Sequence, residues 1–363
     1  MSATTLPQNL LHDIFSLVVL ASKPWLGDLR ESWEEYTIHD DLRSFSLVHS
    51  TWRKPAQALL PSHLNIPESI WKWEETAKKL DKPPFKDAGT TRLMIEGLWG
   101  RVLKKSFEKR WENVTYLWID TPRPNFHGLR FFPNLETLWV CASKLVLDNP
   151  KTRLPRLKRL VLSHNTQIIG KLEMIQQILS PTTMPRLKHL ALHAYHHELS
   201  IRACFLNLLP QINTLALADQ YDSKYSSLLK NLPLMDNLEH LALTIKSTRH
   251  MYQDFWIKVA GLKIKTLHVN YGAIMFDETY TANHSSSHQF SNGLVQIAKG
   301  EMEDVSIERI VVYGMKWFDE EEEKKNGWDF LDWRKNSQIP PFEEFDGGYH
   351  RGSAESETWY YSA

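Results

Sequence analysis

Residues 133–140 read Pro-Asn-Leu-Glu-Thr-Leu-Trp-Val, and the pattern Pro-x-Leu-x-x-Leu-x-Leu that they follow recurs along the chain. Three further copies keep the proline, at residues 155–162, 185–192 and 210–217. Weaker copies keep only the apolar triplet, at Leu238/Leu241/Leu243, Ile264/Leu267/Val269, Val114/Leu117/Ile119 and Ile307/Ile310/Val312. A segment that returns this often decides the architecture before any single residue is considered. It also indicates that the protein functions through a binding surface rather than through a catalytic site.

The spacing of these copies resembles that of leucine-rich repeats. Counted from the proline position, the copies begin at residues 112, 133, 155, 185, 210, 236, 262 and 305. All but two of the steps lie within the roughly 20–29 residues of such a repeat. Between the expected strands, residues 175–179, 201–209 and 225–232 place apolar side chains at helical spacing. The resemblance implies an α/β fold in which strand–helix units stack into an irregular horseshoe-shaped solenoid. The alternative is an α/β domain without a solenoid, in which the pattern recurs by chance.

The composition limits the classes of partner. The chain has 363 residues with 43 basic and 43 acidic side chains, so its formal net charge is zero and gives no reason to expect nucleic acid or an acidic membrane as a partner. No stretch approaches the roughly 18 apolar residues of a membrane span, and the N-terminus lacks the features of a signal peptide. Two cysteines, Cys141 and Cys204, cannot staple a fold of this size. We expect them to be reduced and at least half-buried in a cytoplasmic or nuclear protein.

Two amphipathic segments lie within the first sixty residues. The first, residues 6–15, begins with a Leu-Pro pair, and its proline suits the first turn of a helix. The second, residues 41–53, places another apolar face before a Trp-Arg pair. Together they resemble an F-box over roughly residues 5–66, and the matching positions are Leu6, Pro7, Leu10, Leu11, Ile14, Phe15, Leu47, Val48, Trp52 and Arg53.

The chain departs from the F-box pattern at two places. Residues 22–40 are inserted where the family has a short turn, and Pro55 falls where a third helix should be starting or running. The alternative interpretation is a plain helical cap that shields the first repeat, because solenoids need polar-faced caps. A cap has no need for this order of residues, so we favour the F-box.

The F-box resemblance implies a function. A helical F-box docks an adaptor of the S-phase-kinase-associated type, and through it the cullin of a RING ubiquitin ligase, by placing apolar anchors in a groove. The adaptor-binding residues implied are Leu6, Pro7, Leu10, Leu11, Ile14, Phe15, Leu47, Val48 and Trp52. The expected organisation is an F-box at 1–66, a linker and cap helix at 67–110, repeats at 111–313, and an acidic and aromatic cap and tail at 314–363. The cap helix is expected over residues 91–111.

Strand alternation also predicts a face for the target protein. The leucines of each triplet point to the core, so the residues beside them point to the concave side of the horseshoe. The target-binding residues expected on this face are Tyr116, Trp118, Trp139, Arg159 and His189. Exposed aromatic side chains are common interface anchors. The alternative is that the 67–110 linker or the tail covers these aromatics.

Nothing in the sequence points to catalysis. Glycine-rich phosphate loops and the nucleophile-elbow motif are absent. One repeat holds a group of conceivable metal ligands, His189, His193, His196, His197 and Glu198, but such histidines are more often surface or hydrogen-bonded loop residues. We therefore expect a non-catalytic substrate receptor of a cullin–RING ubiquitin ligase, without cofactor or metal, that binds an unidentified target. The alternatives are a ligase-independent scaffold whose F-box only docks the adaptor, and a small-molecule or enzymatic role in the concave cleft.

Overall fold

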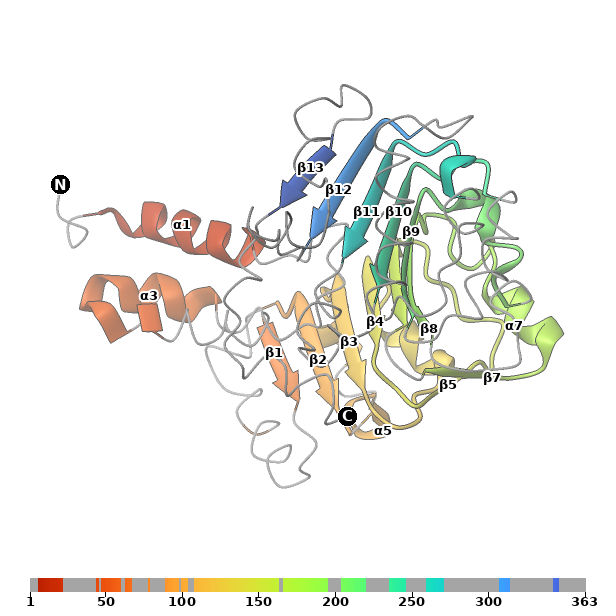
Figure 1. The fold of residues 1–363 in the computed structure, drawn as a ribbon. Coiled ribbons are helices and arrows are strands. Elements are labelled where there is room, and N and C mark those ends of the chain that lie inside the picture. Colours follow the sequence, from red (N-terminus) through yellow and green to blue (C-terminus); the bar gives the residue numbers. More distant parts are fainter. Residues whose placement is uncertain are drawn as a thin grey trace, which may run out of the picture. The chain divides into compact units, whose positions relative to one another are not determined.

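The computed structural model divides the chain into two compact units, residues 1–187 and residues 188–363. The expected domain boundaries at 66, 110 and 313 stay predictions. The structure (Figure 1) describes residues 6–21, 44–45, 47–59, 63–66, 78, 89–97, 99–103, 108–162, 166–194, 204–219, 235–245, 259–270, 307–313 and 342–345.

Two helices open the first unit: α1 (Gln8–Ala21) and α3 (Ser50–Leu59). α1 starts directly after Pro7, whose carbonyl accepts the Leu11 N–H at 3.0 Å. A proline at this position loses nothing, because the first N–H groups of a helix have no partner within it. Pro55 lies inside α3 and is buried there. It withholds one helical N–H without ending the helix.

The first unit also carries a parallel sheet, coloured orange to yellow-green in Figure 1. In spatial order its strands are β1 (His63–Ile66), β2 (Arg92–Glu96), β3 (Tyr116–Asp120), β4 (Thr137–Val140) and β6 (Arg159–Leu162). A separate parallel pair consists of β5 (Lys144–Val146) and β7 (Gln167–Ile169). The short helices of the unit are α5 (Trp99–Val102), α6 (Glu108–Trp111), α7 (Leu172–Ile178) and the 3-10 helix η4 (Phe126–Phe131).

The second unit repeats the same kind of sheet, coloured green to blue in Figure 1. All its strand pairs are parallel. Its strands follow chain order as β8 (His189–Ala194), β9 (Thr214–Asp219), β10 (His240–Ile245), β11 (Thr266–Asn270), β12 (Arg309–Tyr313) and β13 (Phe342–Phe345). A 3-10 turn, η5 (Leu209–Gln211), precedes β9.

The expected helical F-box followed by a leucine-rich-repeat horseshoe is wrong. Parallel sheets with few helices make an α/β-like arrangement instead. The first 66 residues do not close as a helical domain, because residues 63–66 form β1 and pair with β2. Of the expected return helices, the one at 175–179 is α7, and the described part of 201–209 is one helical turn followed by turns and the start of η5. Residues 225–232 lie outside the described part of the chain.

The expected cap helix over residues 91–111 is also wrong. This interval holds β2 and two short helices, α5 and α6. Arg92 through Glu96 pair in register with β3, and Leu93 and Ile95 are buried. Pairing with a neighbouring strand thus overrides a weak helical preference. Gly97 ends the strand with a φ of 74°, a backbone conformation that favours glycine.

One hydrogen-bond arrangement recurs at the strand starts of both units. The Thr115 carbonyl accepts two successive N–H groups, from Glu136 at 2.8 Å and Thr137 at 2.9 Å. In the second unit the Asn213 carbonyl does the same for the two residues that begin the next repeat, at 2.8 and 3.0 Å. These paired bonds fix each strand against the one before it, so equivalent positions align across the sheet.

That alignment produces the core. Leu117 pairs in register with Leu138 in the first unit, and Leu215 with Leu241 in the second. All four side chains are buried. The middle leucine of the repeated pattern therefore points to the core, as expected from the sequence. No helix in the described part of the chain is long and apolar enough to cross a membrane.

Candidate functional site

The helix pair at the N-terminus has its own small core. Leu11 and Phe15 on α1 are buried and pack with Ala56 on α3. Phe15 stacks on Phe45 with ring centroids 4.7 Å apart, and the Trp52 ring lies 5.4 Å from that of Phe15. Aromatic contacts at these distances add to the free energy gained by burial. The two helices therefore hold each other through an interior cluster.

The other apolar side chains of the same segment face solvent. On α1, Leu10 is 43% exposed and Ile14 is 39% exposed; in the helical turn before α3, Leu47 is 79% exposed and Val48 is 61% exposed. Among the described residues, Leu206 is the one other large hydrophobic side chain that is exposed. Single exposed apolar side chains are ordinary, but two on α1 and two in the turn before α3 make this segment a candidate for docking a partner. We call Leu10, Ile14, Leu47 and Val48 the docking surface.

The structure separates the nine residues expected to bind an adaptor into two groups. The first group packs in the internal core of the helix pair: Leu6, Leu11, Phe15 and Trp52. The second group is exposed: Pro7, Leu10, Ile14, Leu47 and Val48. The first group supports the helices, and the second group is accessible to a partner. Binding of an adaptor by these residues stays a prediction.

The aromatic residues expected to anchor a target are buried. Tyr116 is 7% exposed, Trp118 is 5% exposed and Trp139 is 1% exposed. Trp118 and Trp139 are register partners on β3 and β4, with ring centroids 6.3 Å apart. The expectation of exposed aromatic anchors is therefore wrong, because these rings are buried. Their indole Nε1 atoms are buried without a hydrogen-bond partner.

The two remaining residues expected at the target face are only half-buried. Arg159 begins β6 in the first unit, and His189 begins β8 in the second. A cation–π contact lies beside the aromatic pair, where the Arg92 guanidinium carbon is 5.1 Å from the centre of the Tyr116 ring. The first unit thus brings Tyr116, Trp118 and Trp139 together as packing residues. Binding of a target by Arg159 and His189 stays a prediction.

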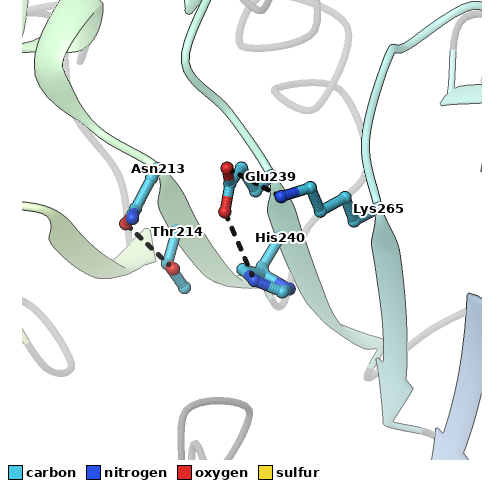
Figure 2. Close-up of polar contacts among 5 residues, drawn as sticks. All are labelled: Asn213, Thr214, Glu239, His240 and Lys265. Carbon is cyan, nitrogen blue, oxygen red and sulfur yellow. Dashed lines mark hydrogen bonds and ion pairs between the residues drawn. The ribbon is translucent and has the colours of Figure 1, made fainter.

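A polar row lies at the strand starts of the second unit (Figure 2). Lys265 Nζ donates to Glu239 Oε1 at 3.0 Å, and Glu239 Oε2 lies 3.9 Å from His240 Nε2. On the neighbouring strand, the Thr214 hydroxyl donates to Asn213 Oδ1 at 3.3 Å. The Glu239–Lys265 pair was not predicted from the sequence, although the residues directly before β10 and β11 carry opposite charges.

The same position forms an ion pair in the first unit, where Lys158 Nζ lies 2.9 Å from Glu136 Oε2. The recurrence identifies both pairs as a structural feature of the repeat. The hydrogen bond and charge of Lys265 lower the pKa of the Glu239 carboxyl. Burial lowers the pKa of the His240 imidazole, against an opposing effect of Glu239. A carboxylate already paired with lysine is a poor general base, so this row does not resemble a catalytic centre.

The metal-ligand group considered in the sequence lies largely outside the described residues, at His196, His197 and Glu198. Among the residues that the structure does describe, no group of three or more histidine, cysteine or acidic side chains could hold a metal ion. Cys141 is half-buried, Cys204 is buried, and the two do not form a disulfide; burial raises the pKa of the Cys204 thiol. No protein-family model matches the chain, and no curated protein matches its sequence.

Proposed function

We propose that this chain is the substrate-recognition subunit of a cullin–RING ubiquitin ligase. The observation that carries the proposal is the exposure of Leu10, Ile14, Leu47 and Val48 on helices whose inward side chains form a separate core. These exposed residues coincide with positions that the F-box resemblance implies for adaptor binding. The proposal therefore rests on side chains and their exposure, and it does not need the expected fold of a separate helical domain.

The physical reason for docking is the apolar area that these side chains leave in water. Burying apolar surface stabilises a complex by about 25 cal/mol per Å². Helices that present several apolar anchors bind by placing them in a groove of a partner. The internal core of the helix pair keeps the anchors in place before the partner arrives, which reduces the entropy lost on binding.

A receptor of this kind performs no chemistry. It binds the adaptor with one region and a target protein with another, and it raises the concentration of the target near the ubiquitin-loaded enzyme. We assign target binding to the two sheets, where half-buried polar residues such as Arg159 and His189 begin the strands. Such a receptor acts in the cytoplasm or nucleus.

Reconstitution from purified proteins tests the proposal. The full chain is mixed with an adaptor of the S-phase-kinase-associated type and with the cullin, and the complexes are separated by size-exclusion chromatography. A receptor gives a complex that contains all three proteins. The alternative, a ligase-independent scaffold, gives a complex with the adaptor that excludes the cullin. Failure of the folded chain to bind the adaptor overturns both.

A further inference from the structure

Two exposed cations lie in the first half of α3, and the first of them, Arg53, is in the first turn, where a positive charge is unfavourable. Arg53 and Lys54 are exposed near its N-terminal end, and the first turn of the helix contains no acidic residue. The N-terminus of a helix carries a partial positive charge, so acidic side chains stabilise it and basic ones do not. A basic residue at the N-terminal end of α3 therefore lowers the stability of the helix. A local choice that opposes stability is commonly explained by function.

Nothing in the described structure neutralises these two cations. Neither Arg53 nor Lys54 forms an ion pair with a described residue. The described residues of the helix pair contain one acidic side chain, Asp13 on α1, which is largely exposed and lies 3.9 Å from His12. The charge that the described part of the helix pair presents to solvent is therefore mainly positive.

The cations and the most exposed anchors are held on one short piece of backbone. The His49 carbonyl accepts the N–H groups of Trp52 and Arg53 at 3.0 and 3.2 Å, and His49 Nδ1 accepts the Thr51 N–H at 3.2 Å. His49 follows Val48 directly in the chain. These bonds tie the turn that carries the exposed apolar pair to the turn that carries Arg53. The exposed apolar pair and the two exposed cations therefore lie within eight consecutive residues, on either side of one hydrogen-bonded turn.

We infer that this segment fits an apolar groove whose rim carries carboxylates. Leu47 and Val48 would enter the groove, while Arg53 and Lys54 would face the acidic rim. The inference rests on the proposed function and adds the chemistry of the partner. Charges at the rim of an interface mainly raise the rate of association and its dependence on salt. Buried apolar anchors mainly set the rate of dissociation.

The test measures association kinetics of the full chain with a recombinant S-phase-kinase-associated adaptor, at 50 and 300 mM salt. The variant Arg53→Glu with Lys54→Glu should associate about tenfold more slowly at low salt and lose most of the salt dependence. Its dissociation rate should change little. Its melting temperature should stay level or rise, because acidic residues suit this end of the helix.

The matched control is Lys151→Glu with Arg156→Glu, which makes the same charge change at exposed positions of the first unit outside the helix pair. It should keep at least half of the wild-type association rate at low salt. The neutral variant Arg53→Gln with Lys54→Gln should lie between wild type and the charge reversal. Normal docking with equal association rates for all four proteins overturns the acidic-rim inference and leaves the proposed function standing. No docking by wild type overturns both.

Discussion

Replacing Gly128 with alanine probes how η4 packs on α5. An added Cβ would lie 2.7 and 2.9 Å from two ring atoms of Trp99, and it would also collide with Leu103 Cδ1. The indole cannot easily swing aside, since its Nε1 donates to Asn125 Oδ1 at 3.0 Å and its ring stacks on Phe132. The Gly128 N–H donates to the same Asn125 oxygen. We expect a loss of about 1–3 kcal/mol, the usual cost of overpacking a core.

Urea unfolding followed by circular dichroism measures this loss as a lower midpoint of the transition that includes the first unit. Gly100→Ala is the matched control, because Gly100 lies in α5 and an added Cβ there meets nothing within 4 Å. The control should be neutral or slightly stabilising. A Gly128→Ala protein whose unfolding coincides with that of wild type would refute the packing of η4 against α5.

Two other predictions concern the sheets. Trp118→Ser with Trp139→Ser should unfold the first unit, because truncating a buried aromatic costs about 3–5 kcal/mol; a wild-type melting temperature would argue against their burial. His240 has a pKa lowered by burial, so its contribution to stability is complete above the ordinary histidine pKa of about 6.5 and declines as the pH falls from there towards the lower folded value. Thermal scans from pH 7 to pH 5 should show a smaller decline for His240→Gln, and an equal decline would contradict this.

The positions of the repeat strands could be predicted because the sequence pattern that indicates each strand lies within the strand itself. The run Leu138-Trp-Val140 follows a proline, alternates in direction and is too short for a helix, and it forms most of β4. Residues 92–96 gave no comparable signal, because they become a strand only through pairing with β3. Short apolar spacings such as those in residues 201–209 were misleading. A helix of one or two turns depends on tertiary packing more than on its own pattern.

The sequence could single out the residues of the candidate site, but it could not predict which of their side chains are exposed. Helical periodicity places Leu10, Leu11, Ile14 and Phe15 along one broad face, but the position of α3 decides that Leu11 and Phe15 turn inward. Strand alternation likewise assigns Trp139 to a face of the sheet without saying whether that face is open. Exposure depends on what packs against an element from elsewhere in the chain, which a local pattern does not contain.

Adaptor affinity of the docking surface tests the central claim most directly. Isothermal titration of the full chain with the S-phase-kinase-associated adaptor compares wild type with Leu47→Ser plus Val48→Ser, and with Leu206→Ser as a control at an exposed leucine outside the docking surface. Removing interface anchors of this kind costs about 2 kcal/mol or more, which is roughly a thirtyfold loss of affinity. We predict that loss for the double variant, with an unchanged melting temperature, and wild-type binding for the control. Equal affinity of the double variant and wild type, or no binding by folded wild-type protein, would contradict the account.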